Sequence, residues 1–189
     1  MADRAAEATN LTADQLFARN LPALTAYLRA RVGSALAARE SICDLAQSVC
    51  REVLTDLDQL RFRSEEAFRA YLFLQASRKV VDRSRYHNTA MRNAGREVAL
   101  PIDDEASELL RDFATLLTPS RQAAAGEHLE RVEKAVQQLP GNQREAVLLS
   151  RIGGISYAEI SRQMGLTDSA VRGLVARGLA QIAAQLGST

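Results

Sequence analysis

The sequence is poor in the residues that sheets require. Among its 189 residues there is no tryptophan, only 5% are aromatic, and there are 10 glycines and 4 prolines. Strands draw on aromatic and β-branched residues, whereas alanine and leucine are abundant here, so the composition favours helices. We therefore expect an all-α protein.

Long apolar runs are also missing. No stretch approaches the roughly 18 uninterrupted apolar residues that a membrane helix needs. The first residues, Met1 to Arg4, lack the basic-then-apolar layout of a secretory signal. These absences predict a cytoplasmic protein with no membrane insertion.

Cysteine is scarce, which limits both disulfides and metal sites. Cys43 and Cys50 lie seven positions apart on one predicted helix, about 10 Å along its axis, too far for a disulfide. We interpret both as small buried apolar side chains. His87 and His128 form no ligand spacing with them, so no metal or cofactor is predicted. Since phosphate-binding glycine loops and recognisable nucleophile sets are absent too, we do not expect an enzyme.

The net charge of +1 conceals an uneven distribution. Residues 15–96 carry 14 cations against 8 anions, residues 97–138 carry 4 against 9, and residues 139–189 carry 5 against 3. Two basic blocks separated by an acidic one indicate two anion-facing modules joined by a segment that avoids the same anion. Charge alone leaves open an uneven scatter of solvated side chains.

Helical periodicity predicts three helices in the first basic block. Residues 12–15 form a capping box that starts the first helix, and Pro22 predicts a break or kink within it. A second helix is expected over residues 41–57. A third begins at Ser64, before two carboxylates, and runs to about Asn93. The cations gathered near its far end are Arg78, Lys79, Arg83 and Arg85.

After a linker with an acidic run at residues 103–105, helix is expected over residues 120–139 and 144–152, and then a helix-turn-helix. Residues 156–159 form a second capping box, and Gly165 stands where a helix needs positive φ to end. Leu166 is expected to enter the core, and Thr167 to cap the second helix. This spacing is typical of a DNA-binding helix-turn-helix.

The second helix of this motif has two different faces. The buried stripe is expected to hold Val171, Val175, Gly178 and Ile182. The outward positions are expected to be Asp168, Ser169, Arg172, Gly173, Ala176 and Arg177. The two arginines can reach guanine edges or phosphates. A three-helix core with no role in DNA binding is the alternative.

Several short motifs lie in the two basic blocks. They are Asp44-Leu45-Ala46-Gln47, Phe68 to Leu72, Leu139-Pro140, Arg144-Glu145-Ala146, Ser156 to Ile160, Met164-Gly165-Leu166 and Ala170-Val171-Arg172. Together they resemble motifs of the extracytoplasmic-function (ECF) class of RNA polymerase sigma factors, and the resemblance covers residues 15–96 and 120–186. It implies two small helical domains, residues 12–96 and 120–187, joined by an acidic linker at residues 97–119.

The resemblance implies a sigma factor that directs the polymerase to promoters, with core RNA polymerase, promoter DNA and an anti-sigma factor as partners. Polymerase binding would fall to Asp44, Gln47 and Arg51. The downstream promoter element would be bound by Arg78, Lys79, Arg83 and Arg85. The upstream element would be read by Ser169, Arg172, Gly173 and Arg177.

Three positions depart from the family's pattern. Cys50 stands where phenylalanine is frequent, and Tyr71 takes a place usually given to tryptophan, which we expect to be core. Leu174 stands where arginine is common, so one phosphate or base contact is expected to be missing. Two other functions remain open: a helix-turn-helix regulator that does not associate with polymerase, and a degenerate sigma paralogue acting through protein contacts.

Overall fold

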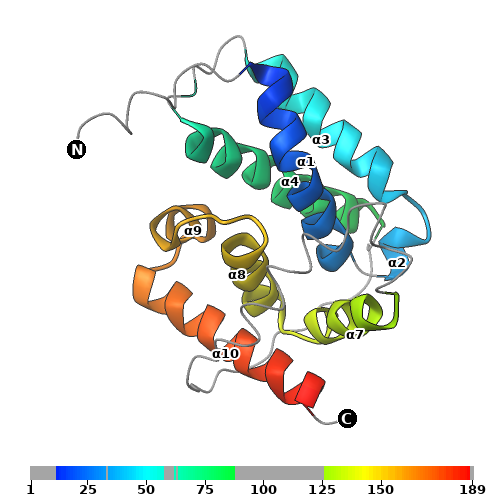
Figure 1. The fold of residues 1–189 in the computed structure, drawn as a ribbon, viewed down its shortest axis with the longest axis vertical. Coiled ribbons are helices and arrows are strands. Elements are labelled where there is room, and N and C mark those ends of the chain that lie inside the picture. The colour runs from blue at the N-terminus through cyan, green and yellow to red at the C-terminus, as the bar shows by residue number, and fades with distance from the viewer. Residues whose placement is uncertain (1–11, 33, 58–61, 63, 88–125, 188–189) are drawn as a thin grey trace.

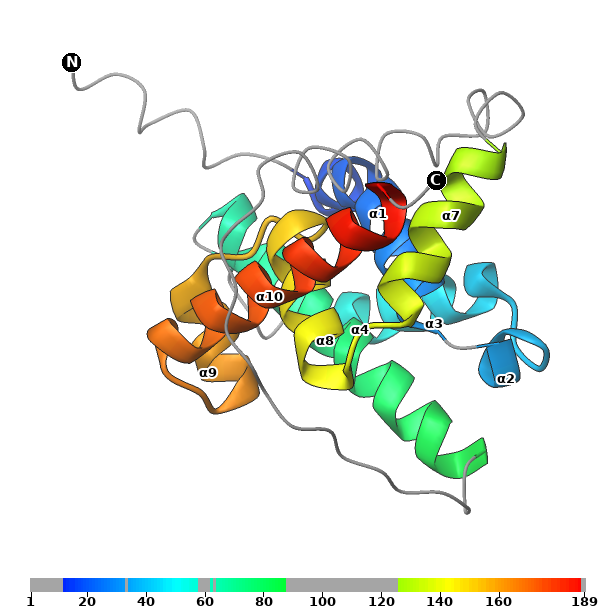
Figure 2. The ribbon, with the colours of Figure 1, turned by 90° about the horizontal axis from the view of Figure 1, so that it is seen from below.

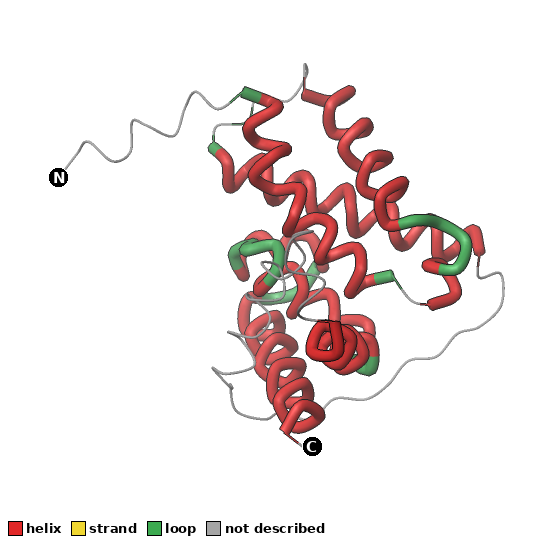
Figure 3. The backbone as a smooth tube through the Cα atoms, turned by 45° about the vertical axis from the view of Figure 1, so that its right-hand side comes forward, coloured by secondary structure: helices red, strands yellow, loops and turns green. Residues whose placement is uncertain are grey.

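The computed structural model describes residues 12–32, 34–57, 62, 64–87 and 126–187, and every regular element in these ranges is a helix (Figure 3). The expected all-α class is confirmed. The first group of helices is α1 (Ala13–Arg31), α2 (Ser34–Ala37), α3 (Ile42–Leu57) and α4 (Glu65–His87). The second is α7 (Gly126–Gln137), α8 (Gly141–Arg151), α9 (Tyr157–Met164) and α10 (Asp168–Gly187) (Figure 1). The predicted linker, residues 97–119, lies outside the described ranges.

Helix α1 begins as its capping box predicts. The Thr12 hydroxyl accepts a hydrogen bond from the Gln15 amide at 3.3 Å, and the Gln15 side chain accepts one from the Thr12 amide at 3.0 Å. Of the break or kink expected at Pro22, the break does not occur, because α1 continues across this residue. Pro22 lies on the exposed side, while Leu24 and Tyr27 on the other side are fully buried. Packing of this buried face compensates for the amide hydrogen bond that proline cannot make.

The core of the first group forms where α1, α3 and α4 meet. Phe68 is fully buried and makes edge-to-face contacts with Phe17 and Phe62, at centroid distances of 5.1 and 5.4 Å. Tyr71, expected in the core, is only half-buried, and its hydroxyl donates to the Asp56 carboxylate at 2.6 Å. The cap predicted at Ser64 is confirmed by a 3.2 Å bond from the Ala67 amide. The expected continuation of α4 over residues 88–93 lies outside the described ranges.

Helix α10 is the centre of the second group and packs on α7, α8 and α9 (Figure 2). The predicted stripe of Val171, Val175, Gly178 and Ile182 is buried, as expected. At Gly178 the helices approach so closely that a β-carbon there would lie 2.6 Å from the Val147 side chain. Helix α8 begins directly after Pro140, three residues earlier than expected. Among the described helices none is both long and apolar enough to cross a membrane.

Candidate nucleic-acid interface

The helix-turn-helix forms between α9 and α10, with each end fixed by local hydrogen bonds. The Ser156 hydroxyl accepts from the Glu159 amide at 3.3 Å, and the Thr167 hydroxyl accepts from the Ala170 amide at 3.2 Å. Gly165 adopts φ 68°, and its amide donates to the Ser161 carbonyl. Glycine occupies this left-handed conformation without the steric cost of a β-carbon. The predicted motif is therefore present in its expected place.

Leu166 does not enter the core as expected. Its side chain remains 38% exposed, while its amide closes the turn by donating to the Ser161 carbonyl at 3.0 Å. Ile160 and Val171, on either side of the turn, are fully buried and fill the interior. The tight turn thus holds Leu166 at the surface beside the start of α10.

The exposed face of α10 is narrower than the sequence predicts. Asp168, Ser169 and Arg172 are exposed, and Gly173 and Arg177 are half-buried. Ala176, expected outward, is buried at 8% exposure. The reason is that α10 packs against three helices rather than one, which widens its buried stripe.

Leu174 belongs to this wider stripe, with only 3% of its surface exposed. From the resemblance to the family, in which arginine is common at this position, we expected that a cation would be missing from the DNA-facing side. In this structure the position is part of the core, where an apolar side chain stabilises the packing. A leucine here therefore removes no cation from the exposed face.

The two arginines predicted to contact DNA lie against different neighbours. The Arg172 guanidinium carbon stands 5.1 Å from the centre of the Tyr157 ring on α9. The Arg177 guanidinium folds back along α10, with one nitrogen 3.2 Å from where a β-carbon on Gly173 would be. Gly173 thus leaves room for Arg177. The sequence predicts no individual role for Tyr157, which belongs to the motif Ser156 to Ile160, because its contact with Arg172 depends on how α9 and α10 cross.

The basic end of α4 is more paired than the sequence suggests. Lys79 forms an ion pair with Glu52 of α3, and only 14% of its side chain is exposed. Arg83 pairs with Glu40 at 3.4 Å, and Arg78 is exposed. The side chain of Arg85 lies outside the described residues. The cations predicted to bind the downstream element therefore differ in how freely they can meet a phosphate.

The three residues predicted to bind polymerase share one face of α3. Asp44, Gln47 and Arg51 are all exposed, at spacings of three and four residues that place them along one side of the helix. Leu54 continues this face with 48% exposure, an apolar contribution that the sequence analysis missed. Leu54 therefore adds apolar area to a face of α3 that is otherwise polar and charged.

Both cysteines are free thiols, but the expectation that both are buried is wrong for one of them. Cys43 is exposed near the start of α3. Cys50 is half-buried, and burial raises the pKa of its thiol. The exposed position of Cys43 follows from its place beside Asp44, on the solvent side of the helix.

A buried ionic contact joins the two groups of helices. The Tyr27 hydroxyl on α1 donates to one oxygen of the Glu145 carboxylate on α8 at 2.8 Å, and the Arg31 Nε donates to the other at 2.5 Å. Burial, together with the charge of Glu145, raises the pKa of Tyr27 well above its ordinary value. Burial opposes the charge on Arg31, but the nearby carboxylate outweighs it and raises the pKa of Arg31.

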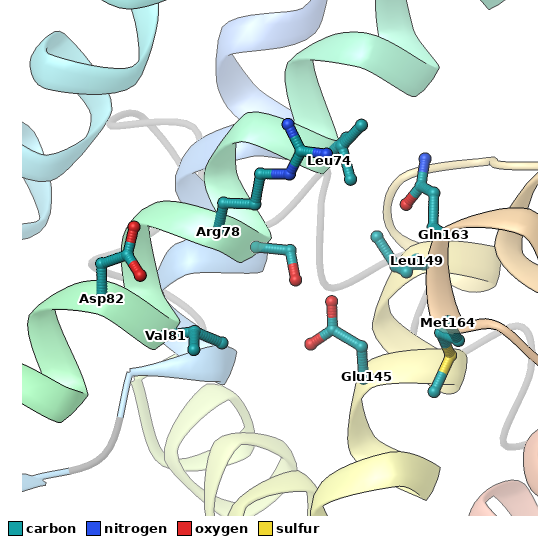
Figure 4. A pocket seen from close by; sticks show the side chains of 9 residues that line it. Leu74, Arg78, Val81, Asp82, Glu145, Leu149, Gln163 and Met164 are labelled. Atoms are coloured by element: carbon teal, nitrogen blue, oxygen red, sulfur yellow. The ribbon is translucent and has the colours of Figure 1, made fainter.

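Two further contacts hold the same junction. The Arg29 Nε donates to Glu133 of α7 at 2.7 Å, and the Gln163 side chain of α9 donates to the Ala70 carbonyl of α4 at 3.1 Å. A cavity of about 400 Å³ remains beside the Glu145 contact, between α4 on one side and α8 and α9 on the other (Figure 4). Arg78 and Asp82 line its α4 side, which places the exposed Arg78 at the edge of the junction.

Residues 129–187, which include the helix-turn-helix, match the family model described as sigma-70, region 4. The ECF RNA polymerase sigma factor SigD of Mycobacterium tuberculosis is 33% identical over 151 residues, which are 80% of this chain and 66% of that protein. The chain thus spans slightly less than two thirds of that relative.

Other relatives align along nearly their whole length. The ECF RNA polymerase sigma factor ShbA of Streptomyces griseus is 32% identical over 182 residues, covering 96% of this chain and 91% of that protein. The ferric citrate uptake sigma factor FecI of Escherichia coli is 26% identical over 179 residues, covering 95% and 93%. In three dimensions, CnrH in its complex with the cytosolic domain of CnrY has the same fold, with a TM-score of 0.59, 24% identity and coverage of 100% and 99%.

Proposed function

Because the chain belongs to the ECF RNA polymerase sigma factors, we propose that it binds core RNA polymerase and directs it to specific promoters to initiate transcription. The observation that carries this proposal is the capped helix-turn-helix of α9 and α10, within residues that match sigma-70 region 4. In this role the protein needs no catalytic site of its own. It acts in the cytoplasm, where polymerase and promoter DNA are found.

Promoter recognition is divided between the two groups of helices. Ser169, Arg172, Gly173 and Arg177 of α10 contact the upstream element. Arg78, Lys79, Arg83 and Arg85 at the end of α4 contact the downstream element. For Lys79 and Arg83 this contact requires that phosphates replace the carboxylates with which they pair. This division is supported by the separation of the two basic surfaces along the chain, residues 15–96 and 139–189. The same division gives the domains proposed at residues 12–96 and 120–187, with residues 97–119 as the linker.

Polymerase binding belongs to the exposed face of α3. Asp44, Gln47 and Arg51 supply polar contacts, and the exposed Leu54 supplies apolar area beside them. A second protein partner, an anti-sigma factor, also fits this proposal. CnrH, which shares the fold, has been solved in complex with the cytosolic domain of CnrY.

A charge reversal on α3 tests polymerase binding directly. Asp44 is exposed and lies on the surface proposed to meet polymerase, so Asp44→Arg introduces a repulsive or unpaired charge there. We expect the affinity of the full chain for purified core polymerase to fall about tenfold, or about 1.4 kcal/mol. The affinity is measured by titrating fluorescently labelled protein with core polymerase.

The matched control is Asp14→Arg, which makes the same charge change at an exposed residue of α1. It should leave the affinity for polymerase within about twofold of the unmodified protein. Equal losses in the two variants would show that net charge, rather than the α3 surface, governs association. No measurable binding of the unmodified chain would overturn the proposed function.

A further inference from the structure

Tyr157 contacts two arginines, each from a different helix. It is the first residue of α9, and the Arg172 guanidinium of α10 lies over its ring at 5.1 Å from the centroid. Its hydroxyl accepts a hydrogen bond at 3.3 Å from Arg151, the last residue of α8. One aromatic side chain therefore gathers two cations that the sequence places 21 positions apart.

Among the described residues, the two gathered cations have no neutralising partner. Within the ranges that the structure describes, neither Arg151 nor Arg172 forms an ion pair with a carboxylate. The neighbouring Arg162 differs, because it pairs with Glu159 one turn away on α9. Like charges held together without a counter-charge repel each other, and an anion between or beside them relieves that repulsion. The cluster is therefore suited to an anionic ligand.

The position of the two arginines within the helix-turn-helix indicates which part of the promoter DNA they contact. In a helix-turn-helix the second helix enters the major groove, whereas the first crosses the sugar-phosphate backbone. Stacking on Tyr157 draws the Arg172 guanidinium toward α9, and thus toward the flank of α10. In this docking geometry, a guanidinium on the α9 side of α10 would lie nearer the sugar-phosphate backbone than the base edges.

On the basis of the proposed function, we propose that Tyr157 is a positioning residue that holds Arg151 and Arg172 as a paired contact to the phosphate backbone of the upstream promoter element. Arg172 is then an anchor for α10 and does not read sequence. Arg151, to which the sequence analysis gave no role, becomes a second anchor from α8.

Tyrosine suits this positioning role for two reasons. Its ring face attracts a cation while leaving the N–H edges of the planar guanidinium free for phosphate oxygens. Its hydroxyl orients the second arginine at the same time. An arginine held in this way loses less conformational freedom on binding than an unsupported one on the exposed surface.

The test uses the full chain with purified core polymerase and two DNA probes. Selection from a pool of duplexes with a randomised upstream element gives the preferred sequence, and that duplex and an unselected one are the probes. Affinity for both is titrated at several salt concentrations. The variants are Arg172→Ala, Arg151→Ala, Tyr157→Leu and Tyr157→Phe, with Lys134→Ala as the control that removes an exposed cation from α7.

Arg172→Ala should weaken binding to both probes by the same factor, about tenfold at moderate salt. The slope of log affinity against log salt should become shallower by about 0.9 for each phosphate contact removed. The preferred sequence should not change. Arg151→Ala should behave similarly, and Lys134→Ala should match the unmodified protein.

Tyr157→Leu should weaken binding about twofold to fivefold when Arg172 is present and less when Arg172 is alanine. Tyr157→Phe keeps the ring and should retain the Arg172 contribution. If Tyr157→Leu does not fold, the two arginine variants still decide the phosphate assignment. A changed preference at one base pair with an unchanged salt slope in Arg172→Ala would overturn the inference. Failure of the unmodified chain to select any sequence would instead overturn the proposed function.

Discussion

Truncating Glu145 should loosen the junction between the two groups of helices. Its side chain is 9% exposed and accepts hydrogen bonds from Tyr27 and from Arg31, which is 20% exposed. Glu145→Ala leaves the hydroxyl of a fully buried tyrosine and a largely buried cation without their acceptor. Breaking a buried pair in this way costs about 3–5 kcal/mol. Because Arg31 retains some solvent contact, we expect about 3 kcal/mol.

Urea unfolding followed by circular dichroism measures this loss. With a slope of about 2 kcal/mol/M, the midpoint should fall by about 1.5 M. Glu145→Gln keeps an acceptor for Tyr27 and should lose less. Glu52→Ala is the control, since Glu52 pairs with Lys79 but is 46% exposed, and it should cost under about 1 kcal/mol. A loss below about 0.5 kcal/mol for Glu145→Ala would refute a stabilising role for this contact between the two groups of helices.

Three further outcomes follow from particular residues. Burial and the nearby carboxylate raise the pKa of Tyr27, so its contribution to stability is full below about pH 10 and is lost at higher pH, where the tyrosine ionises in the unfolded chain. Above about pH 10, the urea midpoint should therefore fall less steeply with pH in Tyr27→Phe than in the unmodified protein. A thiol reagent should label the exposed Cys43 faster than the half-buried Cys50, because the raised pKa of Cys50 disfavours its thiolate. Peptide mass spectrometry measures both labelling rates, and equal rates would contradict the difference in exposure and pKa. Gly178→Ala should lower stability by about 1–3 kcal/mol, since its β-carbon would meet the Val147 side chain at 2.6 Å, and an unchanged melting temperature would contradict the close packing.

Features decided by short-range chemistry were predictable from the sequence. The caps at Thr12, Ser64 and Thr167 and the turn at Gly165 depend on residues within a few positions of one another. The buried stripe of α10 was also visible, because helical periodicity repeats along one element. The exposed face of α3 followed from its resemblance to a family motif.

Features decided by long-range packing were not predictable. Tyr27 and Glu145 lie 118 positions apart, so no local pattern connects them. The burial of Leu174 and Ala176 depends on how many helices pack around α10, which a single-helix periodicity does not contain. The continuation of α1 across Pro22 likewise reflects tertiary packing that outweighs a local helix-breaking preference.

The most direct test of sigma-factor function is run-off transcription with purified core polymerase on genomic fragments from the source organism. Addition of the unmodified protein should yield transcripts of discrete length from a subset of fragments, while core polymerase alone yields none of them. Asp44→Arg should reduce all of these transcripts together, because it acts before promoter selection. Identical transcripts with and without the protein would contradict its assignment as a promoter-recognition subunit.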